Sequence, residues 1–196
     1  MLDKFAQLFL LLSVLCFLAG CGSKIPHMVT PDYSKRGTKL IAILPVNNKA
    51  GDEKAGQMLR EKLLYELYFK GYPKIPFDVI DKKLSQVSTG SKEGNISPQV
   101  VGELLNIEAV MYCTLNECRT SYSYVWASTV ISVNFELRSA KTGETLWRTR
   151  YRTARRNYSF SRKELEVKSC QVYEPAIQEV VDRALKTIPD GPDFLG

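Results

Sequence analysis

The hydrophobic and polar positions of this chain change period several times, and each period predicts a different element. Residues 8–19 are apolar except for Ser13 and show no polar face. The run is too short for a helix that crosses a bilayer, which needs about 20 residues. A buried core helix would carry a polar face. The run is therefore typical of an export signal that is removed from the mature protein.

The next part of the chain alternates short apolar runs with amphipathic segments. Residues 40–46 form a nearly continuous apolar run that is followed by two asparagines, which predicts a buried strand. Residues 51–71 carry an apolar residue at every fourth position, as expected of an amphipathic helix. Residues 77–80 predict a second strand. Residues 97–105 begin with Ser-Pro, which predicts a capped second helix.

In the second half, apolar and polar residues alternate with a period of two. This period over residues 107–115 and 129–137 predicts half-buried antiparallel strands. A glycine-containing turn over residues 139–145 leads to a third such strand over residues 146–153, as a hairpin. A last helix is predicted from Pro175 to the residue before Pro189. The order β-α-β-α-β-β-β-α predicts an α+β domain with a mixed five-stranded sheet and helices packed on it.

These elements divide the chain into four segments. Residues 1–20 are the export signal. Residues 21–38 contain prolines, glycines and polar residues without apolar periodicity, which predicts a flexible tether. Residues 39–188 form one domain, since about 150 residues are the usual size of a single core. Residues 189–196 form a C-terminal tail.

The end of the signal resembles the lipobox of bacterial lipoproteins, in the sequence Leu18-Ala19-Gly20-Cys21. The resemblance implies that the Cys21 thiol carries a diacylglycerol, that the chain is cut before Cys21, and that the new amino group is acylated by a fatty acid such as palmitate. Two or more acyl chains hold a protein stably to a membrane. Gly22 stands where an aspartate would imply retention at the inner membrane. We therefore expect a lipid anchor in the outer membrane, with the domain on its periplasmic face.

Three stretches of the predicted domain resemble a group of small envelope lipoproteins. They are the first strand IAILPVNN, the segment IEAVMYCTL and the hairpin LRSAKTGETLW. In this order they are similar to outer-membrane lipoproteins with a TolB N-terminal-like domain, whose relatives include CsgG and LpoB. The likeness covers residues 39–188 and implies the same α+β fold and a non-enzymatic role. The chain departs from the group at residues 106–108, which are Asn-Ile-Glu where Gly-Ala-Asp is usual, and in a basic stretch over residues 148–168.

The charge of the chain is basic, with 27 Lys and Arg against 21 Asp and Glu and a net charge of +6. The signal contains one acid, Asp3, and one base, Lys4, so its removal leaves the net charge unchanged. A basic surface suits anionic lipid or an acidic partner. An exported protein on a lipid anchor rarely meets nucleic acid, so we expect no nucleic-acid partner.

The sequence contains none of the motifs that mark nucleophilic, phosphate-binding or metal-dependent sites. A serine or cysteine nucleophile needs a base within reach, and the only histidine, His27, lies in the predicted tether. We therefore expect no catalytic residue, no metal and no cofactor, and interpret the protein as an accessory or scaffold subunit of an envelope assembly. Carboxylates need no motif, so an envelope hydrolase that uses them is the alternative. A secretion-pore subunit similar to CsgG would need long amphipathic membrane strands, and the pattern shows none.

Two sets of residues recur at every second position and suggest a partner surface. They are Tyr122, Tyr124 and Trp126, and Arg148, Arg150 and Arg152. If both segments are strands, each set shares one face of the sheet, and the residues between the arginines face the core. Aromatic and arginine side chains are enriched in binding hot spots, and adjacent arginines repel one another unless an acid is near. We predict contact with another envelope protein or an anionic envelope component. A solvated face for the arginines and packing beneath a helix for the aromatic set are the alternatives, and homo-oligomer formation stays open.

Three thiols remain in the predicted mature domain, at Cys113, Cys118 and Cys170. Cys113 shares the strand face of Met111 and Leu115, which predicts a buried core thiol. Cys113 and Cys118 would lie about 16 Å apart along a strand and on opposite faces, whereas a disulfide tolerates about 7 Å. If a disulfide forms in the oxidising envelope, we expect it to join Cys118 to Cys170.

Overall fold

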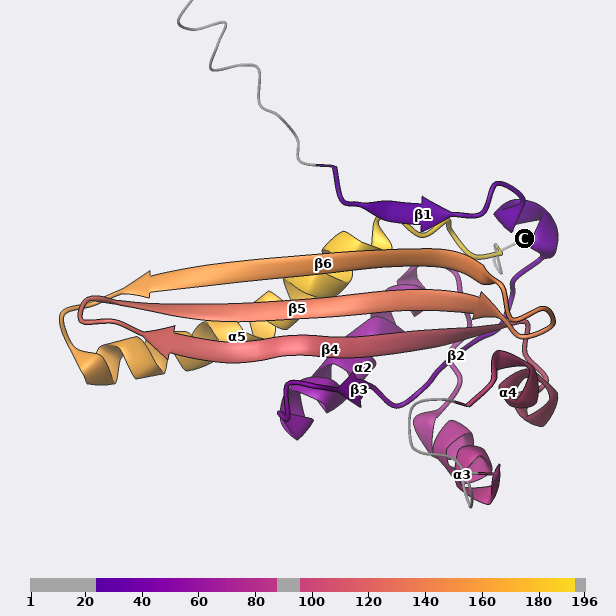
Figure 1. Ribbon diagram of the computed structural model, residues 1–196, viewed down its shortest axis with the longest axis horizontal. Coiled ribbons are helices and arrows are strands. Elements are labelled where there is room, and N and C mark those ends of the chain that lie inside the picture. Colours follow the sequence, from indigo (N-terminus) through magenta and orange to yellow (C-terminus); the bar gives the residue numbers. More distant parts are fainter. Residues whose placement is uncertain (1–23, 88–95, 193–196) are drawn as a thin grey trace, which may run out of the picture.

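The computed structural model describes residues 24–87 and 96–192, and Figure 1 labels its elements. The predicted signal over residues 1–20, the lipidation site Cys21 and the last four residues of the tail lie outside the described residues.

A single six-stranded sheet forms the centre of the fold. The strands are β1 (His27–Val29), β2 (Ile41–Ile43), β3 (Asn47–Asn48), β4 (Ala109–Tyr122), β5 (Trp126–Ser139) and β6 (Thr145–Tyr158). Their order is β1-β6-β5-β4-β2, and β3 also pairs with β4. β2 and β3 run parallel to β4, whereas the other pairs are antiparallel. The predicted α+β class with a mixed sheet is confirmed, although the sheet has six strands in place of five.

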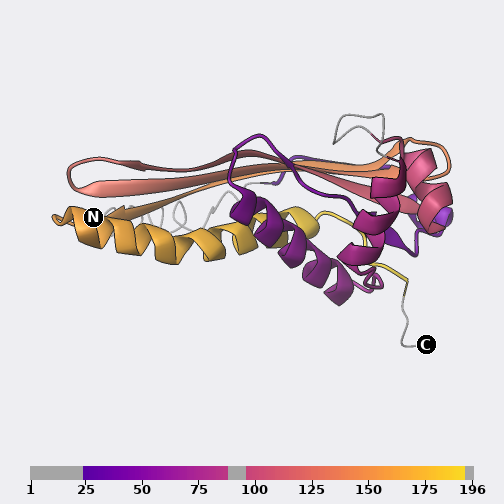
Figure 2. The ribbon, with the colours of Figure 1, turned by 90° about the horizontal axis from the view of Figure 1, so that it is seen from below.

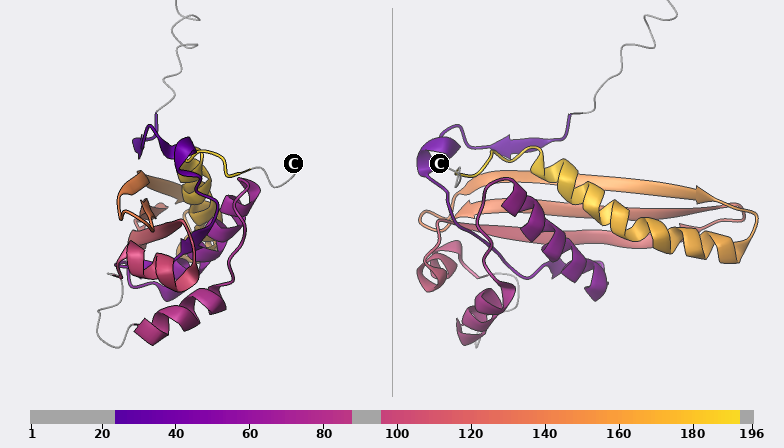
Figure 3. Two further views of the ribbon diagram at one scale, coloured as in Figure 1. Left: turned by 90° about the vertical axis from the view of Figure 1, so that its right-hand side faces the viewer. Right: turned by 180° about the vertical axis from the view of Figure 1, so that it is seen from behind.

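Four α-helices pack against this sheet. They are α2 (Glu53–Phe69), α3 (Phe77–Val87), α4 (Pro98–Leu105) and α5 (Arg162–Leu185), and a short 3-10 helix, η1 (Tyr33–Arg36), follows β1. α2 and α5 cover the same face of the sheet (Figure 2), and α3 and α4 lie at one end of the molecule (Figure 3). Among the described residues, no helix is long and apolar enough to cross a membrane.

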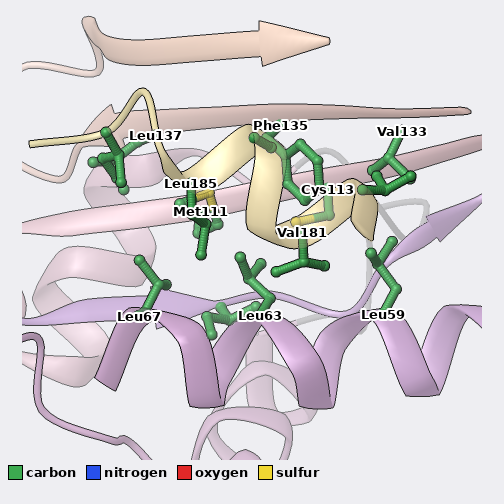
Figure 4. Close-up of a cluster of buried hydrophobic side chains, with 14 of the residues drawn as sticks. Leu59, Leu63, Leu67, Met111, Cys113, Val133, Phe135, Leu137, Val181 and Leu185 are labelled. Carbon is green, nitrogen blue, oxygen red and sulfur yellow. The ribbon is translucent and has the colours of Figure 1, made fainter. Parts of the chain in front are cut away.

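Two hydrophobic cores lie on opposite faces of the sheet, because successive side chains of a strand point to opposite sides. Figure 4 shows the larger core, in which α2 and α5 meet the sheet through Leu59, Leu63, Leu67, Met111, Cys113, Phe135, Leu137, Val181 and Leu185. The smaller core joins β2 and the start of β4 to α3 and α4 through Ala42, Leu44, Ile80, Leu84, Val101 and Val110. α3 and α4 therefore shield only one end of the second face.

The first two predicted helices are confirmed by α2 and α4. Asp52 caps α2 by accepting a hydrogen bond from the backbone N–H of Ala55 at 3.0 Å. Ser97 caps α4, with Pro98 in the first turn, and Asn106 ends the helix in the left-handed conformation with φ of 51°.

The predicted strand over residues 77–80 is wrong, because these residues begin α3. Ile80 and Leu84 are both buried against the second core, at the spacing of four that places two residues on one helix face. A short apolar run does not distinguish a strand from the first turn of a buried helix.

The predicted start of the last helix at Pro175 is also wrong. α5 begins at Arg162 and contains Pro175 in its interior. The missing N–H of a proline disfavours this position, but Leu165 and Ser169 before it and Ala176 after it are all buried. This continuous buried stripe holds the helix across the proline.

The predicted flexible tether over residues 21–38 is wrong from His27 onward. β1 pairs antiparallel with β6, with His27 opposite Thr149. The side chain of Tyr33 is buried, and its hydroxyl hydrogen-bonds to that of Tyr72 at 2.8 Å. The folded domain therefore includes residues that composition alone assigned to the linker.

Candidate functional site

Over one large part of the sheet, the described residues place no helix (Figure 2). Beyond α3 and α4, the second face of β4, β5 and β6 is uncovered, and we call this surface the open face. Its arginines are Arg119, Arg138, Arg148, Arg150, Arg152 and Arg156, whereas its acids are Glu117 and Glu136. The open face is therefore strongly basic.

The predicted arginine stripe lies on this surface. Arg148, Arg150 and Arg152 are exposed on β6. On the helix-covered side, Trp147 before them and Thr149 between them are buried, and Tyr151 is half-buried. The period of two predicted this alternation, because β6 continues without a bulge through this segment.

Acids on neighbouring strands relieve part of the repulsion expected within the stripe. Glu136 lies directly opposite Arg148 on β5. It accepts hydrogen bonds from Arg138 at 2.8 Å and from Thr145 at 2.6 Å. Burial alone would raise the pKa of Glu136, but these hydrogen bonds and the charges of Arg138 and Arg148 outweigh it and lower the pKa. The stripe is therefore partly balanced at its β1 end.

A second acid lies beside the other end of the stripe. Glu117 Oε2 is 3.6 Å from Arg152 Nε, and the two residues flank Ser132 of the central strand. Ser132 is fully buried, and its Oγ has no hydrogen-bond partner among the described residues; the same holds for Glu117 Oε2 and Arg138 Nε. Buried polar atoms without partners are costly, and these three atoms are shielded from solvent.

Arg148 and Arg150 form no ion pair among the described residues, and Arg150 also has no acid directly opposite it. Its cross-strand neighbour is Asn134. Both residues line a shallow hollow of about 490 Å³ between β1 and β5, together with His27, Met28, Glu136 and Arg148. An exposed guanidinium beside such a hollow can bind a carboxylate or phosphate in a bidentate way.

The aromatic set does not share one face, so that part of the prediction is wrong. Tyr122 ends β4 on the helix-covered side, with the Arg162 guanidinium 3.9 Å from its ring centroid. Tyr124 lies in the connection and is 96% exposed, whereas Trp126 begins β5 opposite Tyr158. The chain reverses direction between Tyr122 and Trp126, and the period of two does not continue through a turn.

The three cysteines among the described residues are free thiols. Cys113 is buried in the larger core, as predicted, and burial raises the pKa of its thiol to about 12. Cys118 also packs against this core, because a bulge between Leu115 and Glu117 shifts the alternation by one residue. The expectation that Cys113 and Cys118 lie on opposite faces is therefore wrong.

Cys118 lies close to α5, which carries Cys170. Its Sγ donates a hydrogen bond to Tyr173 Oη at 3.0 Å, and Cys170 is exposed on the same helix, three residues before Tyr173. Residues three apart are neighbours on a helix surface. The pairing of Cys118 with Cys170 stays a prediction.

Three carboxylates line one hollow together with Arg60. Glu53, Glu61 and Asp81 line a hollow of about 400 Å³ with this arginine. Arg60 donates two hydrogen bonds to Asp81, at 2.7 and 2.8 Å, and a further one to the carbonyl of Ile43 at 2.9 Å. These contacts tie α2 to α3 and β2. In the described part of the chain, no group of three or more His, Cys, Asp or Glu side chains could hold a metal ion.

Comparison with solved structures shows that this α+β arrangement is similar to the fold of a known lipoprotein. The crystal structure of lipoprotein GNA1162 from Neisseria meningitidis matches with a TM-score of 0.53 and 21% identity, over 68% of this chain and 94% of that chain. The family model described as "Putative lipoprotein GNA1162-like" matches residues 31–191, and the chain belongs to this family. The predicted resemblance to envelope lipoproteins is thus confirmed.

Two further structures are more distant. A variant PelC dodecamer from Paraburkholderia phytofirmans has a TM-score of 0.49 and 17% identity, over 82% of this chain and 98% of that chain. The LpoB C-terminal domain from Escherichia coli has a TM-score of 0.43 and 13% identity, over 64% of this chain and 94% of that chain. A comparison with curated proteins found no match.

Proposed function

We propose that this protein is a lipid-anchored, non-catalytic subunit of a bacterial envelope assembly and that it holds an acidic protein partner on the open face. The observation that carries the proposal is an uncovered, basic sheet surface on a member of a lipoprotein family. Central to this surface is Arg150, which is exposed and has no acidic partner in the described structure.

The proposed anchor is Cys21, lipidated and placed in the outer membrane with the domain on the periplasmic side. His27, the first residue of β1, is the sixth residue after Cys21. A chain of this length spans at most about 21 Å. Because β1 pairs with β6, the anchor keeps the arginine stripe near the membrane, where it would meet a partner held at the same surface.

The polar character of the open face supports a protein partner with acidic side chains. Arginine forks bind carboxylates in a fixed geometry, and Arg148, Arg150 and Arg152 are all exposed on this face. Contacts of this kind contribute mainly to specificity and association rate, and they weaken as salt rises.

Affinity purification after mild crosslinking in native cells tests this proposal. The triple variant Arg148→Ser, Arg150→Ser, Arg152→Ser should capture less partner, and the difference from the wild type should narrow at high salt. The matched control is Lys54→Ser, Lys82→Ser, Lys83→Ser, which removes the same charge from exposed positions of α2 and α3. If the folded arginine variant captured as much partner as the wild type, the open face would not be the binding surface. Release of a hydrolysed envelope component by the purified protein would instead support the carboxylate-hydrolase alternative.

A further inference from the structure

An exposed aromatic cluster lies at the end of the long strands, away from α3 and α4. Two connections meet there, residues 123–125 between β4 and β5 and residues 159–161 between β6 and α5 (Figure 1). The backbone N–H of Ser159 donates to the carbonyl of Val125 at 3.0 Å and holds them together. We call this cluster the aromatic tip; it consists of Tyr124, Val125, Tyr158 and Phe160.

The side chains of the aromatic tip face solvent. Tyr124 and Phe160 are each 96% exposed, and Tyr158 is 63% exposed. None of the four belongs to either hydrophobic core. Val125, Tyr158 and Phe160 instead line an open hollow of about 620 Å³. Large apolar side chains gathered at one exposed place mark an interaction site.

Basic side chains surround the aromatic tip. The Arg156 guanidinium lies 5.8 Å from the ring centroid of Trp126, and Lys163 is exposed at the start of α5. Arg162 stacks on Tyr122 and also pairs with Glu166 at 2.9 Å. The nearby acid, Glu164, is engaged by Lys168 at 2.6 Å. The tip thus combines an apolar end with a positive rim.

This combination fits the surface of a bilayer that contains anionic lipid. Tyrosine and tryptophan rings prefer the headgroup level, where one end of the ring is apolar and the other is wet. Phenylalanine inserts slightly deeper, at the boundary between headgroups and acyl chains. Each lysine or arginine near an anionic surface adds electrostatic attraction.

A bilayer is within reach of the tip in a lipid-anchored protein. β6 pairs with β1 at Thr149 and ends at Tyr158, nine residues further on. Nine strand residues span about 30 Å. Beyond its three residues paired with β1, β6 forms the edge of the sheet and runs from the anchored end of the domain to the aromatic tip. A domain lying along this edge brings both to one membrane.

From these observations we infer that the aromatic tip is a second membrane contact: Phe160 and Tyr124 enter the headgroup region while Arg156 and Lys163 bind lipid phosphates. This inference rests on the proposed lipid anchor but not on the partner of the open face. The experiments therefore distinguish a failure of the membrane contact from a failure of the protein partner proposed for the open face.

Trp126 provides a local reporter for the test. The chain has two tryptophans; Trp147 is fully buried, whereas Trp126 is half-buried at the tip. The protein extracted from membranes is reconstituted into vesicles of phosphatidylglycerol and phosphatidylethanolamine whose acyl chains carry a nitroxide near the headgroup. A Trp126→Phe variant contains only Trp147, so its fluorescence measures the background signal that does not come from the tip.

We expect the nitroxide to quench Trp126 in the wild type. Phe160→Ser removes one large apolar side chain, so the ratio of inserted to free tips should fall about tenfold. The matched control is Phe69→Ser, because Phe69 is also exposed, at 76%. Phe69 is the last residue of α2. This end of α2 lies near the C-terminal end of α5, because the backbone N–H of Gly191, which follows α5, donates a hydrogen bond to the carbonyl of Lys70. The aromatic tip lies at the N-terminal end of α5, away from Phe69.

Three results would overturn the inference. Trp126 could stay unquenched in the wild type, or quenching could persist in a folded Phe160→Ser, Tyr124→Ser variant. The tip variants could also lose a crosslinked protein without any lipid quenching, which would identify the tip as a protein-docking site. Loss of partner capture by the arginine variant with intact quenching would leave this inference standing.

Discussion

The hydroxyl of Tyr173 on α5 donates a hydrogen bond of 2.5 Å to Oδ2 of Asp52, the residue that caps α2. The other carboxylate oxygen of Asp52 accepts from the backbone N–H of Ala55. One carboxylate thus begins one helix and ties it to another. The hydrogen bond from Tyr173 is the main cause of a lowered Asp52 pKa, and the backbone N–H groups of Ala55 and Lys54 add to it against the effect of burial.

Tyr173→Phe should lower the free energy of unfolding by about 1 kcal/mol, because a hydrogen bond to a partly exposed charge is lost. Urea denaturation measures this change. Tyr65→Phe is the control, since it removes a hydroxyl from an exposed tyrosine of α2 and should leave the denaturation midpoint unchanged. A Tyr173→Phe midpoint equal to that of the wild type would contradict the role of this contact.

The same contact predicts a pH dependence. The pKa of Asp52 is lower in the folded state, so the stability that it contributes is present above its unfolded value of about 3.9 and is lost as the pH falls through the folded pKa. The difference in unfolding free energy between the wild type and Asp52→Asn should therefore have its largest value at neutral pH and decrease below about pH 4. A difference that stays constant into stronger acid would show that the charge of Asp52 is not involved.

Gly102 lets α4 approach the turn that follows β5. A Cβ at this position would lie 2.5 Å from the Cβ of Ala140. Gly102→Ala should lower the free energy of unfolding by about 1–3 kcal/mol through overpacking, and Ala140→Gly should restore part of the loss. Gly56→Ala is the matched control: it lies inside α2, its Cβ would meet nothing closer than 3.6 Å, and it should stabilise by about 0.5–1 kcal/mol. Equal effects of the two substitutions would contradict this packing.

The three cysteines of the domain should differ in reactivity toward iodoacetamide. Cys170 is exposed and should react first, whereas Cys113 is buried and should react only on unfolding. Burial also raises the pKa of Cys118, which should react slowly. Peptide mapping without reduction should find either free thiols or a Cys118–Cys170 bridge. A bridge between Cys113 and Cys118 would contradict the structure, because five residues along one strand span about 16 Å.

Lipidation of Cys21 should be visible in the intact mass of detergent-extracted protein. We expect a chain that begins at Cys21 and carries acyl chains. Cys21→Ser should prevent this modification, whereas Cys16→Ser should leave it unchanged, because Cys16 is removed with the signal. An unmodified chain that begins elsewhere would refute the anchor and, with it, the basis for placing a bilayer near the aromatic tip.

Several features of the fold followed from local pattern. The helices α2 and α4 were predictable because their caps and apolar spacing lie within the elements themselves. The alternation around Arg148, Arg150 and Arg152 was predictable because one unbroken strand contains all three. The short apolar run at residues 77–80 was misread, since neither length nor period separates a strand from a first helical turn in so few residues.

By itself, the sequence determined a basic α+β domain of the lipoprotein type, because charge and periodicity are properties of neighbouring residues. The tertiary structure alone decided which residues meet across the fold. It pairs β1 with β6, turns Cys118 toward the core through a bulge, and places Glu136 opposite Arg148. It also brings Tyr124 and Phe160 to one exposed tip from connections far apart in the chain. Such relationships depend on strand register and on the direction in which each turn leaves the sheet, and no period along the chain encodes them.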